Sequence, residues 1–347
     1  MENVSRLCAV ALAVSLALAP AGAHASAGYV DGISDQSLPA WAGAFAGSSF
    51  ASSFASAWGG RIALARYVVQ WDAMAETSDG PRADGDYREQ FEAWLEDVRS
   101  LGLAPVIALT SYTHAYPRSP GEYQDALEAL LAQADLMGEP AGYVEAWNEP
   151  NGQGGEPAGR AGEIANWANS ICERRGCQVI AGDLEDAPSI STYERAYTGA
   201  LDFSPAIWGI HPYRSLFNHS DATVLRFEQA LPDHGAGAQI WFTEVGAYYC
   251  LDGELRGEAQ QANDVSYLLD TLIPAAAPVH VFYYGFKATG PGGAPCTASG
   301  GDDTELYRAS GAPRAAADLI LDADRARALV FGSDLSAALL ALAPAPS

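Results

Sequence analysis

Basic residues are scarce in this sequence. Its 347 residues include 19 lysines and arginines against 43 aspartates and glutamates, so the formal net charge is −24 at pH 7. Lys287 is the only lysine. A surface of this charge repels the phosphate backbone of nucleic acids, so we expect no nucleic-acid partner. The same repulsion makes a strongly acidic polysaccharide a less suitable substrate.

Motifs for nucleotide cofactors and structural metals are also missing. The sequence contains neither a G-x-G-x-x-G pattern nor a phosphate-binding loop. It has no C-x-x-C pair and no cluster of histidines and cysteines at the spacing of metal ligands. We therefore expect a protein that works without a cofactor or a metal ion.

The sequence has no uninterrupted apolar run long enough for a comfortable membrane helix. Leu7–Leu18 is apolar but falls short of the roughly 20 residues that such a helix needs. Arg6 precedes this run, and Ala23-His24-Ala25 or Ala25-Ser26-Ala27 fits a cleavage site, which predicts a signal peptide over residues 1–27. A retained anchor is the alternative. We expect a secreted protein, extracellular or periplasmic, without stable membrane insertion.

Cysteine is sparse, and its number is informative. Cys8 lies in the predicted signal, which leaves Cys172, Cys177, Cys250 and Cys296 in the mature chain. An even number of cysteines in an exported protein indicates two disulfides, and four cysteines allow three connectivities. The short spacing favours Cys172–Cys177, which leaves Cys250–Cys296 as the second pair. Reduced cysteines packed in the core are the alternative.

The rest of the chain alternates short apolar runs with amphipathic segments. The predicted strands are Tyr29–Ile33, Ile62–Gln70, Ala104–Thr110, Tyr143–Trp147, Gln178–Ala181, Ile207–Ile210, Gln239–Thr243 and His280–Tyr284. The predicted helices include Asp86–Ser100, one opened by the capping box Ser119-Pro120-Gly121-Glu122, Ala161–Arg174, Asp221–Ala230, Ala259–Leu272 and Pro313–Leu321. Several strands are apolar on both faces, as in parallel sheets covered by helices. This alternation predicts an α/β fold, a single (β/α)₈ TIM barrel over residues 28–321.

The C-terminal tail, residues 322–347, has no assigned structure. It is apolar over Ala337–Leu342, but Gly332, Ser333 and Asp334 interrupt the pattern, so we do not predict a membrane span. We expect the protein to be a monomer.

Polar residues follow several of the predicted strands. Glu149 ends the fourth strand and Glu244 ends the seventh. In a (β/α)₈ barrel the active site lies at the carboxyl ends of the strands. We therefore expect these two carboxyl groups to lie close together at that end of the barrel. A pair of carboxyl groups is the requirement for cleavage of a glycosidic bond with retention. We assign Glu149 as the acid/base and Glu244 as the nucleophile.

Other polar and aromatic residues near the strand ends suit sugar binding. Asn148 can both donate to and accept from a sugar hydroxyl, and His211 and Tyr213 can hold the nucleophile ionised. Arg66, near the end of the second strand, is either a site residue or a partner for a neighbouring carboxylate. The remaining candidates are flat rings on which a sugar can stack, although packing is an equally good explanation for each: Trp71, Tyr112 and Tyr284.

Trp147-Asn148-Glu149-Pro150 and Phe242-Thr243-Glu244 resemble the motifs of clan A glycoside hydrolases. In that clan, an Asn-Glu pair ends strand four and the nucleophile ends strand seven. The resemblance extends in strand order over the mature chain, including His211-Pro212-Tyr213 on strand six, and is strongest to the group around family thirty-nine. It implies a retaining hydrolase of equatorial, mostly β-glycosidic bonds. One departure is at strand eight, where the clan usually has a tryptophan and this chain has Phe282-Tyr283-Tyr284-Gly285-Phe286.

Two alternatives use the same fold. A transglycosylase has the same two carboxylates and differs in how well water competes with an acceptor sugar. A non-catalytic carbohydrate-binding barrel is the alternative outside enzymes, since one fold hosts unrelated functions. Such a protein usually loses a catalytic carboxylate, and this sequence retains both.

Overall fold

The computed structural model describes residues 30–36, 57–74, 87–113, 116–152, 155–231, 238–288, 296 and 302–324. The predicted signal peptide and the tail beyond residue 324 lie outside the described residues.

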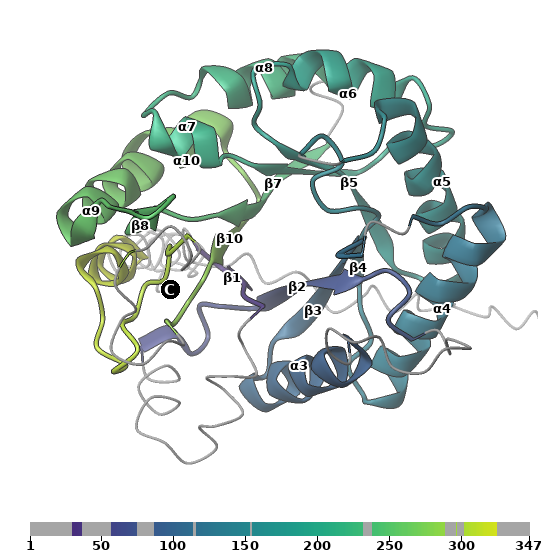
Figure 1. The fold of residues 1–347 in the computed structure, drawn as a ribbon, viewed down its shortest axis with the longest axis horizontal. Coiled ribbons are helices and arrows are strands. Elements are labelled where there is room, and N and C mark those ends of the chain that lie inside the picture. The colour runs from purple at the N-terminus through teal and green to yellow at the C-terminus, as the bar shows by residue number, and fades with distance from the viewer. Residues whose placement is uncertain are drawn as a thin grey trace, which may run out of the picture.

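The parallel strands form a closed barrel in the order β1-β10-β7-β6-β5-β4-β3-β2 (Figure 1). They are β1 (Gly32–Ser34), β2 (Leu64–Gln70), β3 (Ala104–Thr110), β4 (Tyr143–Glu145), β5 (Gln178–Glu185), β6 (Ile207–His211), β7 (Gln239–Val245) and β10 (His280–Tyr284). Each overlaps one of the predicted strands, so the predicted (β/α)₈ barrel is confirmed.

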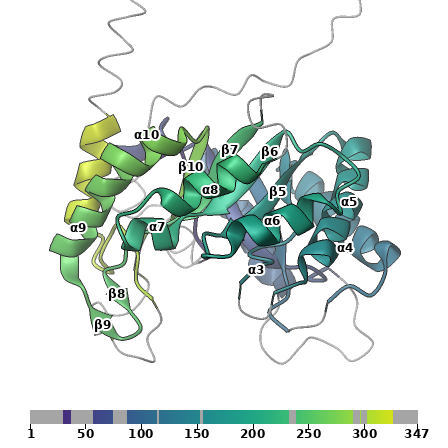
Figure 2. The same cartoon turned by 90° about the horizontal axis from the view of Figure 1, so that it is seen from above.

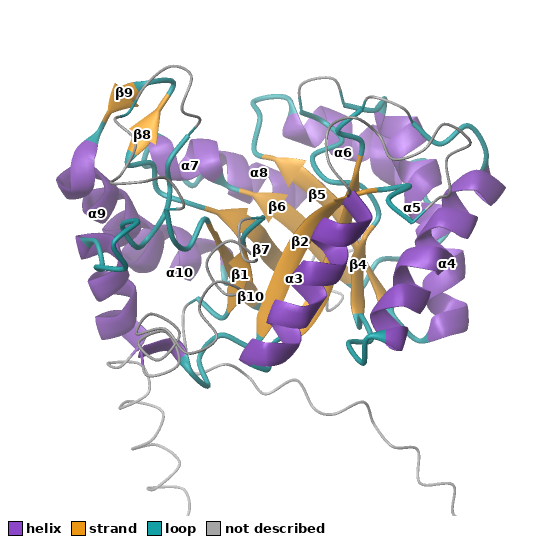
Figure 3. Cartoon of the chain, turned by 60° about the horizontal axis from the view of Figure 1, so that its bottom comes forward, coloured by secondary structure: helices purple, strands orange, loops and turns teal. Residues whose placement is uncertain are grey.

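Helices surround this barrel on its outside, as Figure 2 and Figure 3 show from two further directions. They are α3 (Tyr87–Leu101), α4 (Pro120–Leu136), α5 (Ala158–Arg175), α6 (Ile190–Thr198), α7 (Tyr213–Phe217), α8 (Ala222–Ala230), α9 (Gly257–Tyr267), the π-helix η2 (Leu268–Leu272) and α10 (Ile273–Ala276). Residues 315–324 are also helical. A small antiparallel pair, β8 (Cys250–Leu251) with β9 (Glu254–Leu255), lies in the loop after β7. Among the described helices, none is both long enough and apolar enough to cross a membrane.

The start of α4 illustrates how local sequence places a helix. Ser119 Oγ accepts a hydrogen bond from the backbone N–H of Glu122 at 3.2 Å, as the predicted capping box requires. Glu122 reaches back to the N–H of Arg118 at 2.6 Å. With its start fixed, the helix buries Leu127 and Leu130 against the barrel. The helices elsewhere follow the same rule, with one apolar face turned to the sheet.

The interior of the barrel has an apolar floor. Each of seven strands contributes one inward side chain to it: Leu64, Val106, Tyr143, Ile180, Ile207, Trp241 and Phe282. Side chains of a strand return to the same face every second residue. Arg66, Glu145 and Thr243 are therefore the next inward residues on β2, β4 and β7, and all three are buried. A polar layer thus lies directly above the apolar floor.

Strand β5 extends beyond its predicted end at Ala181 because it contains a bulge. The register with β6 shifts between Gly182 and Leu184. Gly182 and Asp183 both have positive φ angles, 82° and 52°, a conformation that glycine adopts freely and aspartate tolerates. Bulges redirect side chains near active sites, and this one brings Asp183 into the polar layer.

The structure contains two disulfides, Cys172–Cys177 and Cys250–Cys296. This is the pairing that the sequence predicts. The first links the end of α5 to the turn before β5, and the second starts at β8, beyond the carboxyl end of β7.

Candidate active site

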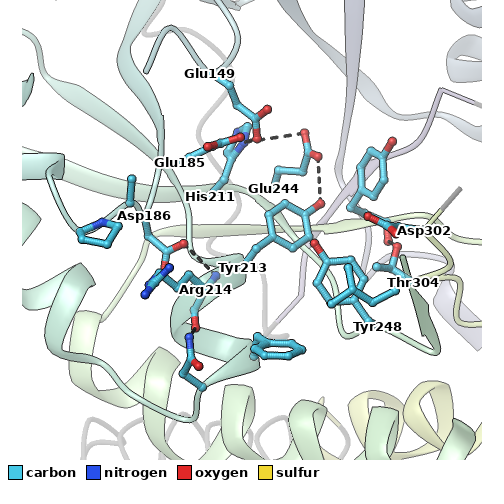
Figure 4. A pocket seen from close by; sticks show the side chains of 16 residues that line it. Glu149, Glu185, Asp186, His211, Tyr213, Arg214, Glu244, Tyr248, Asp302 and Thr304 are labelled. Atoms are coloured by element: carbon cyan, nitrogen blue, oxygen red, sulfur yellow. Dashed lines mark hydrogen bonds and ion pairs between the residues drawn. The ribbon is translucent and has the colours of Figure 1, made fainter. Parts of the chain in front are cut away.

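Glu149 and Glu244 face one cavity of about 880 Å³ over the carboxyl ends of the strands (Figure 4). Glu149 lies in the loop after β4, and its φ of 45° places it in the left-handed region. Glu244 lies within β7, with a side chain only 10% exposed against 27% for Glu149. An oxygen of each carboxyl group and a ring nitrogen of His211 lie within 4.8 Å of one another. The structure thus brings together the two carboxyl groups that the sequence assigns to catalysis.

Both oxygens of Glu244 are held by hydrogen-bond donors. Arg66 Nη1 donates to Oε2 at 2.6 Å and the Tyr213 hydroxyl donates to Oε1 at 2.8 Å. Burial, with a smaller contribution from the negative charge of Glu149, raises the pKa of the Glu244 carboxyl above its ordinary value, and the positive charges of His211 and Arg66 and the Tyr213 hydrogen bond oppose this rise. The donors therefore oppose the effect of burial and favour the ionised form of this carboxyl group.

Arg66 is fully buried and organises the polar layer. Its Nε contacts both oxygens of Glu145, at 3.0 and 2.8 Å. Its Nη2 donates to Asn148 Oδ1 at 2.6 Å and to Asp183 Oδ2 at 3.0 Å. A buried guanidinium is tolerated only when its donors are satisfied in this way. Arg66 is thus both a partner of neighbouring carboxylates and a direct contact of the Glu244 side chain.

His211 lies between two carboxyl groups. Its Nδ1 is 2.7 Å from Glu149 Oε1 and its Nε2 is 2.8 Å from Asp183 Oδ1. Burial lowers the pKa of His211, but the nearby Asp183 and Glu244 carboxylates raise it well above its ordinary value. Conversely, burial would raise the pKa of Asp183, and the adjacent His211 and Arg66 cations hold it well below its ordinary value. We therefore assign His211 as a cation that donates from both ring nitrogens.

This assignment bears on metal binding. Within the described part of the chain, Glu149, His211 and Glu244 form the one group of ligand atoms close enough to hold an ion. A histidine binds a metal through a neutral nitrogen with a free lone pair. Since both nitrogens of His211 face carboxylate oxygens, the arrangement favours proton chemistry over metal coordination at this position.

The aromatic candidates lie in different surroundings. Tyr284 lines the cavity and makes an edge contact with Tyr213, with ring centroids 6.3 Å apart. Tyr248 also lines it and stacks on Tyr213 at 5.7 Å. Tyr112 is 49% exposed beside β3, whereas Trp71 is 4% exposed and packs within the core. Tyr284 is therefore better placed than Trp71 to contact a sugar in this cavity.

The sequence analysis did not identify several acidic residues of the site, among them three on or next to β5. Asp183 anchors His211, and Glu185 and Asp186 line the cavity. The Asp186 carboxylate accepts from the N–H groups of Arg214 and Ser215 at 2.8 and 2.5 Å and so holds the start of α7. The available signal was the Gly182-Asp183 pair after a predicted strand, since a glycine in a strand pattern suggests a bulge.

No protein family and no curated protein matches the sequence, but solved structures match the fold. A GH30 endoxylanase from Clostridium papyrosolvens C71 is 14% identical, with a TM-score of 0.53 over 84% of this chain and 71% of that one. The GH39 enzyme from Xanthomonas axonopodis pv. citri is 12% identical, with a TM-score of 0.54 over 84% and 65%. An endo-1,4-beta-D-mannanase from Thermotoga petrophila RKU-1 is 12% identical, with a TM-score of 0.53 over 86% and 99%.

At these identities the likeness shows a shared fold. The sequence predicts a resemblance to glycoside hydrolase barrels, including the group around family thirty-nine. These solved structures confirm that resemblance for the fold.

Proposed function

We propose that this protein is a secreted retaining glycoside hydrolase that cleaves β-glycosidic bonds in a polysaccharide or oligosaccharide. The proximity of Glu149 and Glu244 carries the proposal, because an oxygen of each lies within 4.8 Å of the other. Carboxyl groups in retaining enzymes are about 5–5.5 Å apart, whereas inverting enzymes need about 6.5–9.5 Å to accommodate a water molecule. The spacing here favours direct attack by one of the carboxylates.

In the first step, Glu244 attacks the anomeric carbon and Glu149 gives its proton to the leaving oxygen. The bond to the leaving group breaks as a bond from Glu244 to the sugar forms. In the second step, Glu149 takes a proton from water, the water oxygen bonds to the anomeric carbon, and Glu244 leaves as a carboxylate. The greater exposure of Glu149 supports this division of roles, since the acid must reach a leaving group in the open part of the cavity.

Neighbouring residues support the reaction in different ways. Arg66 and Tyr213 hold Glu244 ionised and oriented. Asn148 offers its amide N–H groups to the sugar hydroxyl beside the scissile carbon, because its oxygen already accepts from Arg66. We assign Tyr284 to the floor of the cleavage subsite and Tyr112 to a more exposed stacking position; Trp71 stays a weaker candidate.

Two observations support the proposed substrate class. The similar structures include proteins described as an endoxylanase and an endo-1,4-beta-D-mannanase. A neutral β-linked polysaccharide also suits a protein with a net charge of −24. We propose hydrolysis rather than transglycosylation as the outcome.

The proposed location outside the cytoplasm is supported by two observations. The N-terminal sequence fits a signal peptide over residues 1–27. The structure contains two disulfides, which persist in oxidising compartments and are rare in the cytosol. We propose a monomer with one catalytic domain over residues 28–321.

The test is product analysis on a panel of substrates. The purified protein is incubated with xylan, mannan, β-glucans and a set of aryl β-glycosides, and products are read by mass spectrometry and by the anomer first formed in NMR. We expect cleavage with retained configuration. Glu244→Ala should lose turnover on every substrate, whereas Glu149→Ala should keep activity on substrates with good leaving groups and gain rate with added azide. Full turnover by both variants, or an inverted product, would refute the proposal.

A further inference from the structure

Glu185 is a third carboxyl group at the proposed acid/base. It ends β5 and is half-buried at the wall of the same cavity. The Glu149 side chain is close enough to contribute to the raised pKa of Glu185, and Figure 4 shows both side chains next to His211. Ionisation of both carboxyl groups at once is unfavourable, because two negative charges this close repel each other.

The backbone fixes this contact from both sides. Asn151, two residues after Glu149, donates from Nδ2 to the carbonyl of Glu185 at 2.8 Å and accepts from its N–H at 2.9 Å. Gly152 follows, and a Cβ there would lie 3.0 Å from Glu185 Oε1 and 3.2 Å from the carbonyl of Glu149. The loop after β4 and the end of β5 are thus joined where the two carboxyl groups meet.

Charged groups reach Glu185 from several elements. Glu149 comes from the loop after β4, His211 from β6, Asp186 from the next position along the chain, and Arg214 from α7 across the cavity. Burial raises the pKa of Glu185 to about 7, with the negative charge of Glu149 as the next cause and the His211 cation opposing both. Glu185 therefore keeps its proton to a higher pH than an ordinary glutamate does.

The proposed acid needs such a partner. An acid that protonates a leaving group must hold a proton in the free enzyme. A protonated neighbour can return the proton through the direct contact.

We infer that Glu185 is a positioning residue that shares one proton with Glu149 in the free enzyme and delivers it to Glu149 when the leaving group departs. This inference rests on the proposed glycosidase reaction. In the first step the proton moves from Glu185 to Glu149 and on to the leaving oxygen. In the second step Glu149 takes a proton from water and the pair shares it again, so that the net reaction consumes one water molecule.

The test is the pH profile of kcat/KM for Glu185→Gln, measured with the phenyl β-glycoside of the sugar that the panel identifies. The wild-type alkaline limb is expected near pH 7, because the pKa of Glu185 is raised to about 7. Glu185→Gln removes the group whose pKa is raised, so the limb should move to lower pH by about one unit, with about a tenfold loss of kcat/KM above the limb and little change at low pH. Glu185→Asp keeps a carboxyl group at this position, so its alkaline limb should lie between those of Glu185→Gln and the wild type.

Two controls separate this role from a structural one. Asp302→Asn removes a carboxylate from the far wall of the same cavity and should leave the limb in place. The 2,4-dinitrophenyl glycoside has a leaving group that needs no proton, so wild type and Glu185→Gln should share one profile on it. A general structural defect would instead lower activity on both substrates alike.

The outcomes distinguish this inference from the proposed function. One outcome is that the alkaline limb of Glu185→Gln lies at the wild-type pH while Glu149→Ala no longer cleaves the phenyl glycoside. In that case the inference that Glu185 shares a proton with Glu149 is wrong, and the glycosidase assignment stands. If Glu149→Ala and Glu244→Ala both turn over normally, the glycosidase assignment fails first. An equal shift in the Asp302→Asn profile also overturns proton sharing, because the effect would then be one of general charge.

Discussion

At the residue scale, two buried cations organise an otherwise acidic site. Arg66 contacts the Glu145, Asp183 and Glu244 carboxyl groups, and His211 bridges Glu149 and Asp183. Breaking a buried ion pair by removing one partner leaves an uncompensated charge, which is strongly destabilising. Substitutions of Arg66 or His211 would therefore change folding stability as well as any role in the reaction. Removing the hydroxyl of Tyr213 tests the site with less effect on folding.

Tyr213→Phe removes one hydrogen bond to Glu244 Oε1, 2.8 Å long, and preserves the ring. A hydrogen bond to a charged group contributes about 1.5–3 kcal/mol, which corresponds to roughly a 10- to 100-fold change in rate. We expect kcat/KM on an aryl glycoside to fall by that factor, because Glu244, the proposed nucleophile, loses a donor that orients it. Steady-state kinetics of the variant measure this directly.

Tyr123→Phe is the matched control. The Tyr123 hydroxyl donates to the carbonyl of Ala146 at 2.8 Å, and the residue is buried on α4 away from the cavity. This variant should lose about 1 kcal/mol of stability and retain its kinetic constants. A similar rate loss in both variants would show that the Tyr213 effect is not specific to Glu244.

At the scale of elements, the strands were predictable and their irregularities were not. The eight barrel strands have apolar or β-branched runs that a local pattern can identify, and Glu149 and Glu244 followed from the rule that barrel sites lie at strand ends. The extension of β5 through a bulge was missed, because its positive φ angles at Gly182 and Asp183 are stabilised by contacts from other strands. The short helices α6 and α7 were missed as well.

The cavity contains several residues that the sequence analysis named, but the acidic residues of β5 and most contacts between side chains were not predicted. His211 and Tyr213 were expected to hold the nucleophile. In the structure the hydroxyl of Tyr213 does contact Glu244, while His211 lies closest to Glu149 and Asp183. Such contacts join residues far apart in the sequence, and they depend on how each strand is staggered around the barrel. Periodicity within one strand carries no information about that stagger.

The position of Gly32 in β1 gives a test of the barrel interior. A Cβ on Gly32 would lie 2.4 Å from Cδ1 of Phe282, a fully buried ring in the apolar floor. The ring is enclosed by other strands and cannot move aside easily. Gly32→Ala should therefore destabilise the protein by about 1–3 kcal/mol, the usual cost of overpacking, read as a lower urea midpoint.

Gly121→Ala controls for the loss of glycine itself. Gly121 lies in the first turn of α4, and a Cβ there meets nothing within 4 Å. Alanine favours helix over glycine by about 0.8–1 kcal/mol in a helix interior, so this variant should be neutral or more stable. A Gly32→Ala midpoint equal to wild type would mean that the barrel floor rearranges more freely than its packing indicates.

At the scale of the whole molecule, the second disulfide joins distant parts of the chain beside the cavity. Cys250 also pairs through its backbone with Asp303, whose N–H donates to the Cys250 carbonyl at 3.0 Å. The neighbours Asp302 and Thr304 line the cavity. The wall on this side is therefore held by the disulfide and, independently, by backbone hydrogen bonds.

Replacing both cysteines of this pair by serine should consequently affect stability more than catalysis. The bond spans a sequence separation of 46, for which the chain-entropy relation gives roughly 4 kcal/mol, against about 2 kcal/mol for the separation of 5 at Cys172–Cys177. We expect the Cys250→Ser/Cys296→Ser protein to unfold at lower urea than Cys172→Ser/Cys177→Ser. Both should keep kcat/KM near wild type, because the backbone contacts of Cys250 with Asp303 remain. Equal midpoints would contradict the chain-entropy account, and a selective loss of kcat/KM in the first protein would mean that the disulfide, rather than the backbone pairing, holds the cavity wall in its active position.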